Sequence, residues 1–257
     1  MIHSTAIIHE DAKISDNVTI GPYSIVEANA VIGKGTKIGS HCVIGRNTIL
    51  GEDNIVSAFA SVGSASQSRG GYLDLDGRVE IGNRNVIHEY CTINRGLAKF
   101  GGVTRLGDDN VLMVYSHVGH DCSIGHHVTL VNNATLAGHV ILQNTCIIGA
   151  FVSIRQFVTI GAYSFATESA VLIKDVLPFL IVRRNPATVA GVNRIGLQRH
   201  GFTDDEIKII AQAYRAIFKQ GLTSEAAVQW LSVKVTEHPV LQPMLDLLKH
   251  SERGIVR

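Results

Sequence analysis

The chain has 257 residues, a formal net charge of +1 and an apolar content of 46%. This composition supports a folded core, and the near-zero charge gives no general attraction to nucleic acid or to anionic membranes. The N-terminus lacks a signal-peptide pattern, and no stretch reaches the ~18 apolar residues of a transmembrane helix, so we expect a cytoplasmic protein without stable membrane insertion.

Aliphatic residues recur every six positions over most of the chain. Three runs carry this period, Ile2–Val62, Ile81–Ile93 and Leu106–Leu172. The next residue is often glycine, which suits a corner where the backbone bends or takes a positive φ. A small or β-branched residue lies two positions before the aliphatic one. The period excludes helices and coiled coils, and predicts a triangular parallel β-helix with three six-residue units per coil.

The same period explains the four cysteines. All of them fall on the small inward position: Cys42, Cys91, Cys122 and Cys146. We expect buried, reduced thiols that behave as small apolar side chains. The spacings contain no CxxC pair, so a disulfide framework or a cysteine zinc site is not expected.

Two segments interrupt the period, 63–80 and 94–105, and we interpret both as loops. The first is rich in glycine, serine and charge, and the second carries Arg95, Lys99 and Arg105. Loops on a rigid scaffold frequently contact substrates. For the first loop, a tolerated insertion is an equally good interpretation.

Helical patterns follow the repeats. Thr203 and Glu206 form a capping box ahead of an apolar helical stripe. Gly221 is suited to end this helix, a second helix is expected near Thr223, and a third from Pro239.

Together these patterns predict a mainly β chain with two domains. Residues 1–190 would form the β-helix and residues 191–257 a small C-terminal α-helical domain. An isolated prism exposes flat flanks and a strand edge, a liability that proteins manage by capping or assembly.

The segment SHVGHDCSIGHH, residues 116–127, concentrates four histidines, an aspartate and a cysteine. Because Val118 points inward and Gly119 forms a corner, His120 and Asp121 should lie on the outer surface, while Cys122 turns inward. Histidine ionises near neutral pH, so His120 with an adjacent carboxylate is suited to general-base catalysis.

Two other interpretations compete. Carbonic anhydrases with this repeat bind zinc through histidines of adjacent subunits, but they require a histidine five positions after His120, where this chain has Gly125. Surface histidines without a role are the third interpretation, which we favour for His126 and His127.

Three motifs resemble the UDP-N-acetylglucosamine O-acyltransferase family, and the resemblance spans the whole chain. They are HDCSIG at 120–125, NNATLAGHV at 132–140 and GVNRIGLQRHGF at 191–202. The resemblance implies a left-handed β-helix and a homotrimer with clefts between subunits. It also implies transfer of a 3-hydroxyacyl chain from acyl carrier protein to the sugar 3-hydroxyl of a UDP-N-acetylglucosamine-type nucleotide, the first step of lipid A biosynthesis.

The resemblance also assigns residues. It implies that His120 is the base, that Asp121 assists it, and that the Gly138 N–H stabilises the oxyanion. It places the substrate contacts at Arg155, Gln156, His139, Glu168, Asn193 and Arg199. It implies no metal and no cofactor, since the acyl carrier protein thioester is a co-substrate.

The chain departs from the family pattern at three places. Arg155 replaces the usual histidine before QF, and Glu168 occupies a chain-length position that is glycine in enzymes for long chains. The loop SQSRGGYLDLDG lacks the family's Gln-Asp-Leu-Lys-Tyr segment, and Asp74 and Asp76 are candidates for its sugar contacts. Three alternatives follow: N-acylation of a 3-amino sugar nucleotide, an acetyl-CoA-dependent sugar acetyltransferase, and a non-catalytic binding paralogue.

Overall fold

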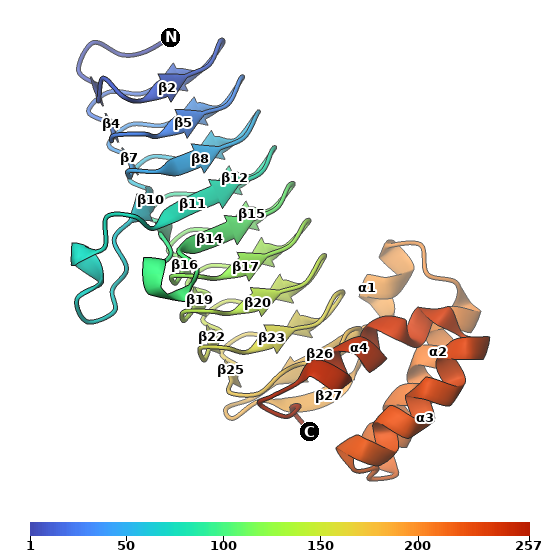
Figure 1. Cartoon of the computed structure of the whole chain (residues 1–257). Coiled ribbons are helices and arrows are strands. Elements are labelled where there is room, and N and C mark those ends of the chain that lie inside the picture. The colour runs from blue at the N-terminus through green and yellow to red at the C-terminus, as the bar shows by residue number, and fades with distance from the viewer.

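The computed structural model describes all 257 residues as a three-sided stack of coils followed by helices (Figure 1). Short strands form three sheets of nine, eight and ten strands, here named sheets 1, 2 and 3. Pairing is parallel throughout, except for the antiparallel pair of β26 and β27. His117, for example, pairs with Thr135, eighteen residues and one coil later. The predicted fold class, a left-handed parallel β-helix with C-terminal helices, is confirmed.

The strands of each sheet come from every third unit of the chain. Sheet 1 contains β1 (Ile7–Ile8), β4 (Ile25–Val26), β7 (Val43–Ile44), β10 (Ser61–Ser64), β13 (Thr92–Asn94), β16 (His117–Val118), β19 (Thr135–Leu136), β22 (Ser153–Ile154) and β25 (Val171–Leu172). Sheet 2 contains β2 (Lys13–Ile14), β5 (Val31–Ile32), β8 (Thr48–Leu50), β11 (Arg78–Ile81), β14 (Val103–Leu106), β17 (Ser123–Ile124), β20 (Ile141–Leu142) and β23 (Thr159–Ile160). Sheet 3 contains β3 (Thr19–Ile20), β6 (Lys37–Ile38), β9 (Ile55–Val56), β12 (Val86–Ile87), β15 (Val111–Leu112), β18 (Thr129–Leu130), β21 (Ile147–Ile148), β24 (Phe165–Ala166), β26 (Leu180–Arg183) and β27 (Thr188–Val192).

The core is built from the two inward positions of each repeat. Aliphatic residues such as Ile44 and Leu112 are fully buried, and so are the small residues between them. All four cysteines are buried free thiols, as predicted. Ile2 is an exception with 47% exposure, because no coil lies above it to cover its side chain.

The glycines that follow the aliphatic positions are required for close approach between coils. A Cβ on Gly21 would lie 2.6 Å from the carbonyl carbon of Gly39, one coil further on. The positive φ angles fall two residues later, at non-glycine residues such as Tyr23 (57°) and His41 (56°). The sequence therefore locates the corners correctly, but positive φ is not the reason for most of these glycines.

Both interruptions of the repeat leave the prism at the same corner. The first connects β10 to β11 and the second connects β13 to β14, so each runs from sheet 1 to sheet 2. They contain the short helices η1 (Gly71–Leu73) and η2 (Ala98–Phe100). We call this edge the loop corner, meaning the turns from sheet 1 to sheet 2.

The C-terminal part contains more structure than the sequence predicted. Its elements are α1 (Arg194–Arg199), α2 (Asp204–Tyr214), the π-helix η3 (Arg215–Lys219), α3 (Ser224–Glu237), η4 (Pro239–Leu241) and α4 (Gln242–His250). The capping box of Thr203 and Glu206 is present at the start of α2, and Gly221 has a φ of 72°. Helix α1 and the β26–β27 hairpin were not predicted. The division into two domains at residue 190 stays a prediction.

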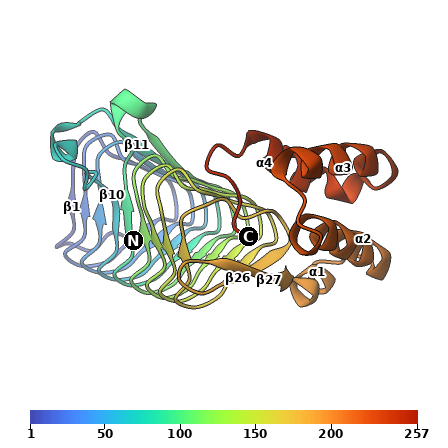
Figure 2. The same cartoon turned by 90° about the horizontal axis from the view of Figure 1, so that it is seen from below.

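The helices and the loop corner lie on different sides of the prism. Figure 2, which looks along the stack, places the two loops on one side and α1, α2 and α3 on the other. The hairpin extends sheet 3, and Asn193 Nδ2 donates to the carbonyl of Tyr163, at the corner between sheets 2 and 3. None of the helices combines the length and the apolar character needed to cross a bilayer.

Candidate active site

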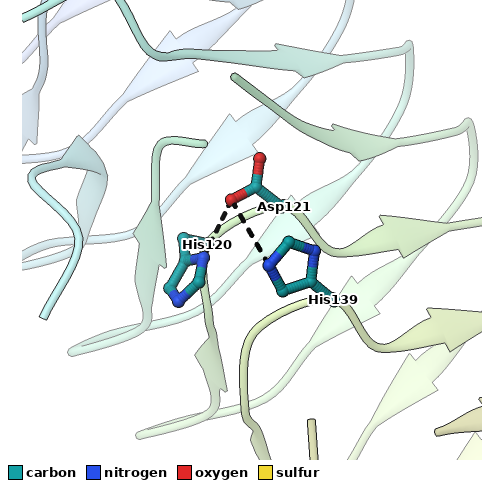
Figure 3. A group of neighbouring side chains, drawn as sticks. All are labelled: His120, Asp121 and His139. Atoms are coloured by element: carbon teal, nitrogen blue, oxygen red, sulfur yellow. Dashed lines mark hydrogen bonds and ion pairs between the residues drawn. The ribbon is translucent and has the colours of Figure 1, made fainter. Parts of the chain in front are cut away.

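His120 and Asp121 lie in the turn after β16, at the loop corner. His120 Nδ1 is 2.8 Å from Asp121 Oδ2, and the two side chains are only 15% and 5% exposed (Figure 3). An ionised carboxylate only accepts hydrogen bonds, so Nδ1 carries the proton and Nε2 is left free to accept one. The sequence correctly placed both residues outside the prism core, although it did not predict how far they are covered.

Gly138 lies in the next coil, directly against the imidazole. A Cβ at this position would come within 2.6 Å of His120 Cε1 and Nε2, so only glycine allows the ring to lie where it does. The Gly138 N–H has no acceptor within the chain. The corresponding amides at another corner, those of Asp108, His126 and Ala162, donate to side chains of adjacent coils. The Gly138 amide is therefore available to a ligand oxygen beside the imidazole.

His139 completes a cluster with His120 and Asp121. Its Nε2 lies 4.0 Å from Asp121 Oδ2 and is buried without a hydrogen-bond partner (Figure 3). Its ring stacks on Phe157 with centroids 4.4 Å apart. Burial lowers the pKa of His139, and the nearby His120 adds to this effect while Asp121 opposes it. A neutral His139 has one ring nitrogen that donates and one that accepts, which suits it to bind a neutral polar group.

The second loop covers this cluster from outside. The Leu97 N–H donates to Asp121 Oδ2 at 3.1 Å, and the Asp121 N–H donates to Thr104 Oγ1 at 2.9 Å. The Phe100 ring lies 6.3 Å from the His120 ring and nearly parallel to it. These contacts could not be predicted from the sequence, since a backbone amide leaves no compositional signal. An apolar Phe100 in a glycine-rich charged loop was the one available clue.

Arg155 and Gln156 lie one coil beyond the cluster at the same corner. Gln156 is exposed. Arg155 lines an open hollow of about 320 Å³ together with Lys174, Glu252 and Arg253. The Arg253 guanidinium lies 5.3 Å from the centre of the Phe157 ring, so the hollow adjoins the aromatic stack under His139.

Three predicted substrate residues are not near His120 in the same chain. Asn193 caps α1 by accepting from the Gly196 N–H, and Arg199 is exposed on the same helix. Glu168 is exposed at the corner between sheets 3 and 1.

The side chains of this cluster are also of the types that bind a metal cation. Ligand atoms of His120, Asp121 and His139 all lie within 4.8 Å of one another. His126 and His127, in contrast, are exposed at the next corner, where His126 Nδ1 accepts from the Asp108 N–H. The zinc interpretation would therefore have to use the three clustered side chains.

Comparisons with known proteins cover the full chain. Residues 175–256 match the family model for UDP-N-acetylglucosamine O-acyltransferase, domain 2, and residues 11–46, 29–64 and 104–138 match the bacterial transferase hexapeptide model. The acyl-(acyl-carrier-protein)–UDP-N-acetylglucosamine O-acyltransferase of Paraburkholderia phymatum is 49% identical over 261 residues, which cover 100% of this chain and 99% of the relative. The enzyme of the same name from Thiobacillus denitrificans is 43% identical over 256 residues, with the same coverage.

A solved structure agrees with the sequence comparisons. The UDP-N-acetylglucosamine acyltransferase of Francisella novicida superimposes with a TM-score of 0.96 at 39% identity, covering 100% of this chain and 94% of the other. Full-length identity above 40%, the shared fold and the family-model match lead to one conclusion: the chain belongs to the acyl-(acyl-carrier-protein)–UDP-N-acetylglucosamine O-acyltransferase family.

Proposed function

We propose that this chain transfers a 3-hydroxyacyl group from acyl carrier protein to the 3-hydroxyl of UDP-N-acetylglucosamine, the first step of lipid A biosynthesis. Family membership supports the reaction class. The observation that carries the proposal is the His120–Asp121 pair beside the unpaired Gly138 N–H. Acyl transfer from a thioester requires a general base and a hydrogen-bond donor for the oxyanion, both next to the reacting carbonyl group.

The proposed mechanism uses His120 twice. Its Nε2 removes the proton of the sugar hydroxyl as the oxygen attacks the thioester carbonyl, a step for which general-base catalysis contributes ~10²–10⁴ in rate. The Gly138 N–H donates to the oxyanion of the tetrahedral intermediate, and such a donor is typically worth ~10²–10³. When the intermediate collapses, the thiolate leaves and takes the proton from His120. Asp121 holds the ring in the required tautomer and stabilises its cationic form.

This mechanism requires no metal and no cofactor, because the thioester is already activated. The protein's contribution is to hold two substrates together, to move one proton and to stabilise one negative charge. His139, with an unpaired buried Nε2 in the same cluster, is placed to donate to or accept from a substrate group.

We further propose a cytoplasmic homotrimer with its active clefts between subunits. Asn193 and Arg199 lie at the two ends of α1 and Glu168 lies at the corner between sheets 3 and 1, away from the loop corner of His120, so a neighbouring subunit would have to supply them. Exposed isoleucines on the outer sheet faces, among them Ile7 (64%) and Ile55 (43%), support such an assembly. Glu168 at the expected chain-length position favours a shorter acyl group than glycine would.

A donor-and-acceptor assay tests the reaction. Purified protein is mixed with acyl carrier protein thioesters of several chain lengths and with UDP-N-acetylglucosamine or its 3-amino analogue. We expect turnover with the hydroxyl acceptor and a 3-hydroxyacyl donor. Turnover with the amine alone would favour N-acylation, turnover with acetyl-CoA alone would refute the lipid A assignment, and binding without turnover would indicate a non-catalytic paralogue. One equivalent of zinc in the active protein would revive the metal interpretation.

A single substitution tests the assigned base. His120→Ala should lower kcat at least ~10²-fold while leaving the oligomer intact, since the ring lies outside the prism core. His127→Asn is the matched control, because His127 is exposed at the next corner and asparagine tolerates its φ of 56°. A kcat for His120→Ala within twofold of the control would rule out the base role.

A further inference from the structure

We propose that Asp74 is a positioning residue for the catalytic pair: by holding the second loop, it keeps the Leu97 N–H on the Asp121 carboxylate. This inference rests on the proposed function of His120 and Asp121. It also gives Asp74 a different role from the sugar contact for which the sequence made it a candidate.

The carboxylate of Asp74 is already engaged by the protein. Its Oδ2 accepts from the Ala98 N–H at 2.7 Å, and its Oδ1 accepts from the N–H groups of Asp76 and Gly77, each at 3.1 Å. Although burial raises the pKa of Asp74, the bonds from Ala98, Gly77 and Asp76 outweigh it and hold that pKa below its usual range. Both carboxylate oxygens thus bind backbone amides of the two loops, and the group stays charged at neutral pH.

Arg95 also connects the two loops. This residue is only 5% exposed, and its guanidinium donates to the carbonyl oxygens of Asp74 and Gly63, at 2.8 Å and 3.3 Å. The backbones also touch directly, since a Cβ on Gly77 would lie 1.8 Å from the Gly96 carbonyl oxygen. We call this set of contacts between Asp74, Arg95 and Ala98 the loop clasp.

The loop clasp is connected to the catalytic pair through the neighbouring residues Ala98 and Leu97. Ala98, which Asp74 binds, begins η2 and is the neighbour of Leu97, whose N–H donates to both oxygens of Asp121 at 3.3 Å and 3.1 Å. Phe100 is the last residue of the same short helix, and its ring lies nearly parallel to the His120 ring at 6.3 Å. Without the Asp74 carboxylate, the Ala98 amide loses a charge-assisted hydrogen bond, and the segment that holds Asp121 is no longer fixed.

One effect on catalysis follows. The His120 imidazole is held less firmly, and small misplacements of a catalytic group reduce turnover strongly. The loss should therefore appear in kcat rather than in KM.

Kinetics of Asp74→Asn test the inference, with Asp16→Asn as the matched control. Asp16 is exposed in the turn between β2 and β3, and its side chain makes no hydrogen bond. For Asp74→Asn we expect kcat to fall about tenfold and KM for UDP-N-acetylglucosamine to change less than about twofold. Asp16→Asn should behave as the unaltered chain. A raised KM with normal kcat would show a sugar contact instead, and would overturn the inference.

Hydrogen exchange provides a second readout that does not depend on activity. In Asp74→Asn, the amides of 97–100 should exchange faster, while those of β17 keep their protection. Unchanged protection of 97–100 would overturn the loop clasp even if activity fell. If the unaltered chain showed no acyl transfer but this exchange result held, the proposed function would fail while the clasp would stand.

Discussion

The Gly138 backbone approaches the His120 ring so closely that the two residues must be considered together. The missing side chain leaves room for the imidazole, and the N–H beside it has no partner in the chain. Glycine is therefore required here for space, since Gly138 is not among the residues with positive φ.

Gly138→Ala should lower kcat by about 10–100-fold, because a Cβ only 2.6 Å from Cε1 and Nε2 pushes the imidazole away from the reacting atoms. Gly191→Ala is the control, since a Cβ at Gly191 meets nothing within 4 Å. Steady-state kinetics with thermal unfolding of both variants separates displacement from misfolding. Normal kcat in Gly138→Ala would mean that the ring position has no importance for turnover.

His117, beside this site on β16, makes stability depend on pH. Its Nδ1 lies 2.7 Å from Thr92 Oγ1, and burial lowers the pKa of His117 below its ordinary value. As the pH falls below about 6.5, the unfolded chain therefore binds a proton at His117 that the folded chain does not bind. The contribution of His117 to the free energy of unfolding is complete above that pH and is lost as the pH falls. In His117→Gln, the thermal midpoint should fall less between pH 7.5 and pH 5.5, measured at one chain concentration. An equal fall in both proteins would refute this assignment.

At the residue scale, the sequence correctly predicted whether a side chain points into or out of the prism wherever the six-residue period determines this. It placed His120 and Asp121 outward and Cys122 inward, because alternation within a six-residue unit leaves no other choice. It could not supply the Leu97 amide or the Phe100 ring over the histidine, since neither belongs to the repeat.

The sequence correctly predicted where the turns of the prism lie. It was wrong to suggest positive φ as a reason for most of the glycines there. Most corners hold a non-glycine residue in the left-handed region, where L-residues lose about 1–2 kcal/mol. Thr145, at the corner between sheets 2 and 3, has a φ of 62° and a β-branched side chain that makes no hydrogen bond.

Thr145→Gly should stabilise the chain by roughly 0.5–1 kcal/mol, because relief of the backbone strain exceeds the entropy that glycine loses on folding. Thr129→Gly, in the regular strand β18, should destabilise by about 1 kcal/mol, since no strain is relieved there. Urea unfolding of the two variants gives the comparison. If Thr145→Gly also destabilises, the turn positions are not strained.

Local signals also decided which C-terminal elements could be predicted. Helices α2 and α3 begin with threonine caps and were identified from them. The six-residue α1 depends on Asn193, which binds the carbonyl of Tyr163 thirty residues earlier, and η3 has its Ile217 carbonyl bound by Arg257 at the C-terminus. Contacts between distant parts of the chain leave no local pattern.

At the scale of the whole molecule, the predicted site residues do not all meet in one chain. His120, Asp121, Gly138 and His139 meet at the loop corner. Asn193 and Arg199 lie on the helical side of the prism, and Glu168 lies at the corner between sheets 3 and 1. A cleft formed by two copies would unite these residues, because rotation about a three-fold axis brings different edges of neighbouring chains together.

Mixed oligomers test this arrangement. His120→Ala and Arg199→Ala should each be poorly active alone, since every cleft then lacks either the base or the arginine. If the two chains are co-expressed in equal amounts and assemble at random, about a quarter of the clefts pair an intact His120 with an intact Arg199 from the neighbour, and activity should recover to about that fraction. Light scattering should give three times the chain mass of 27.7 kDa for each sample. If the mixture is no more active than the two variants alone, each chain must supply both residues to its own site, and the intersubunit cleft is wrong.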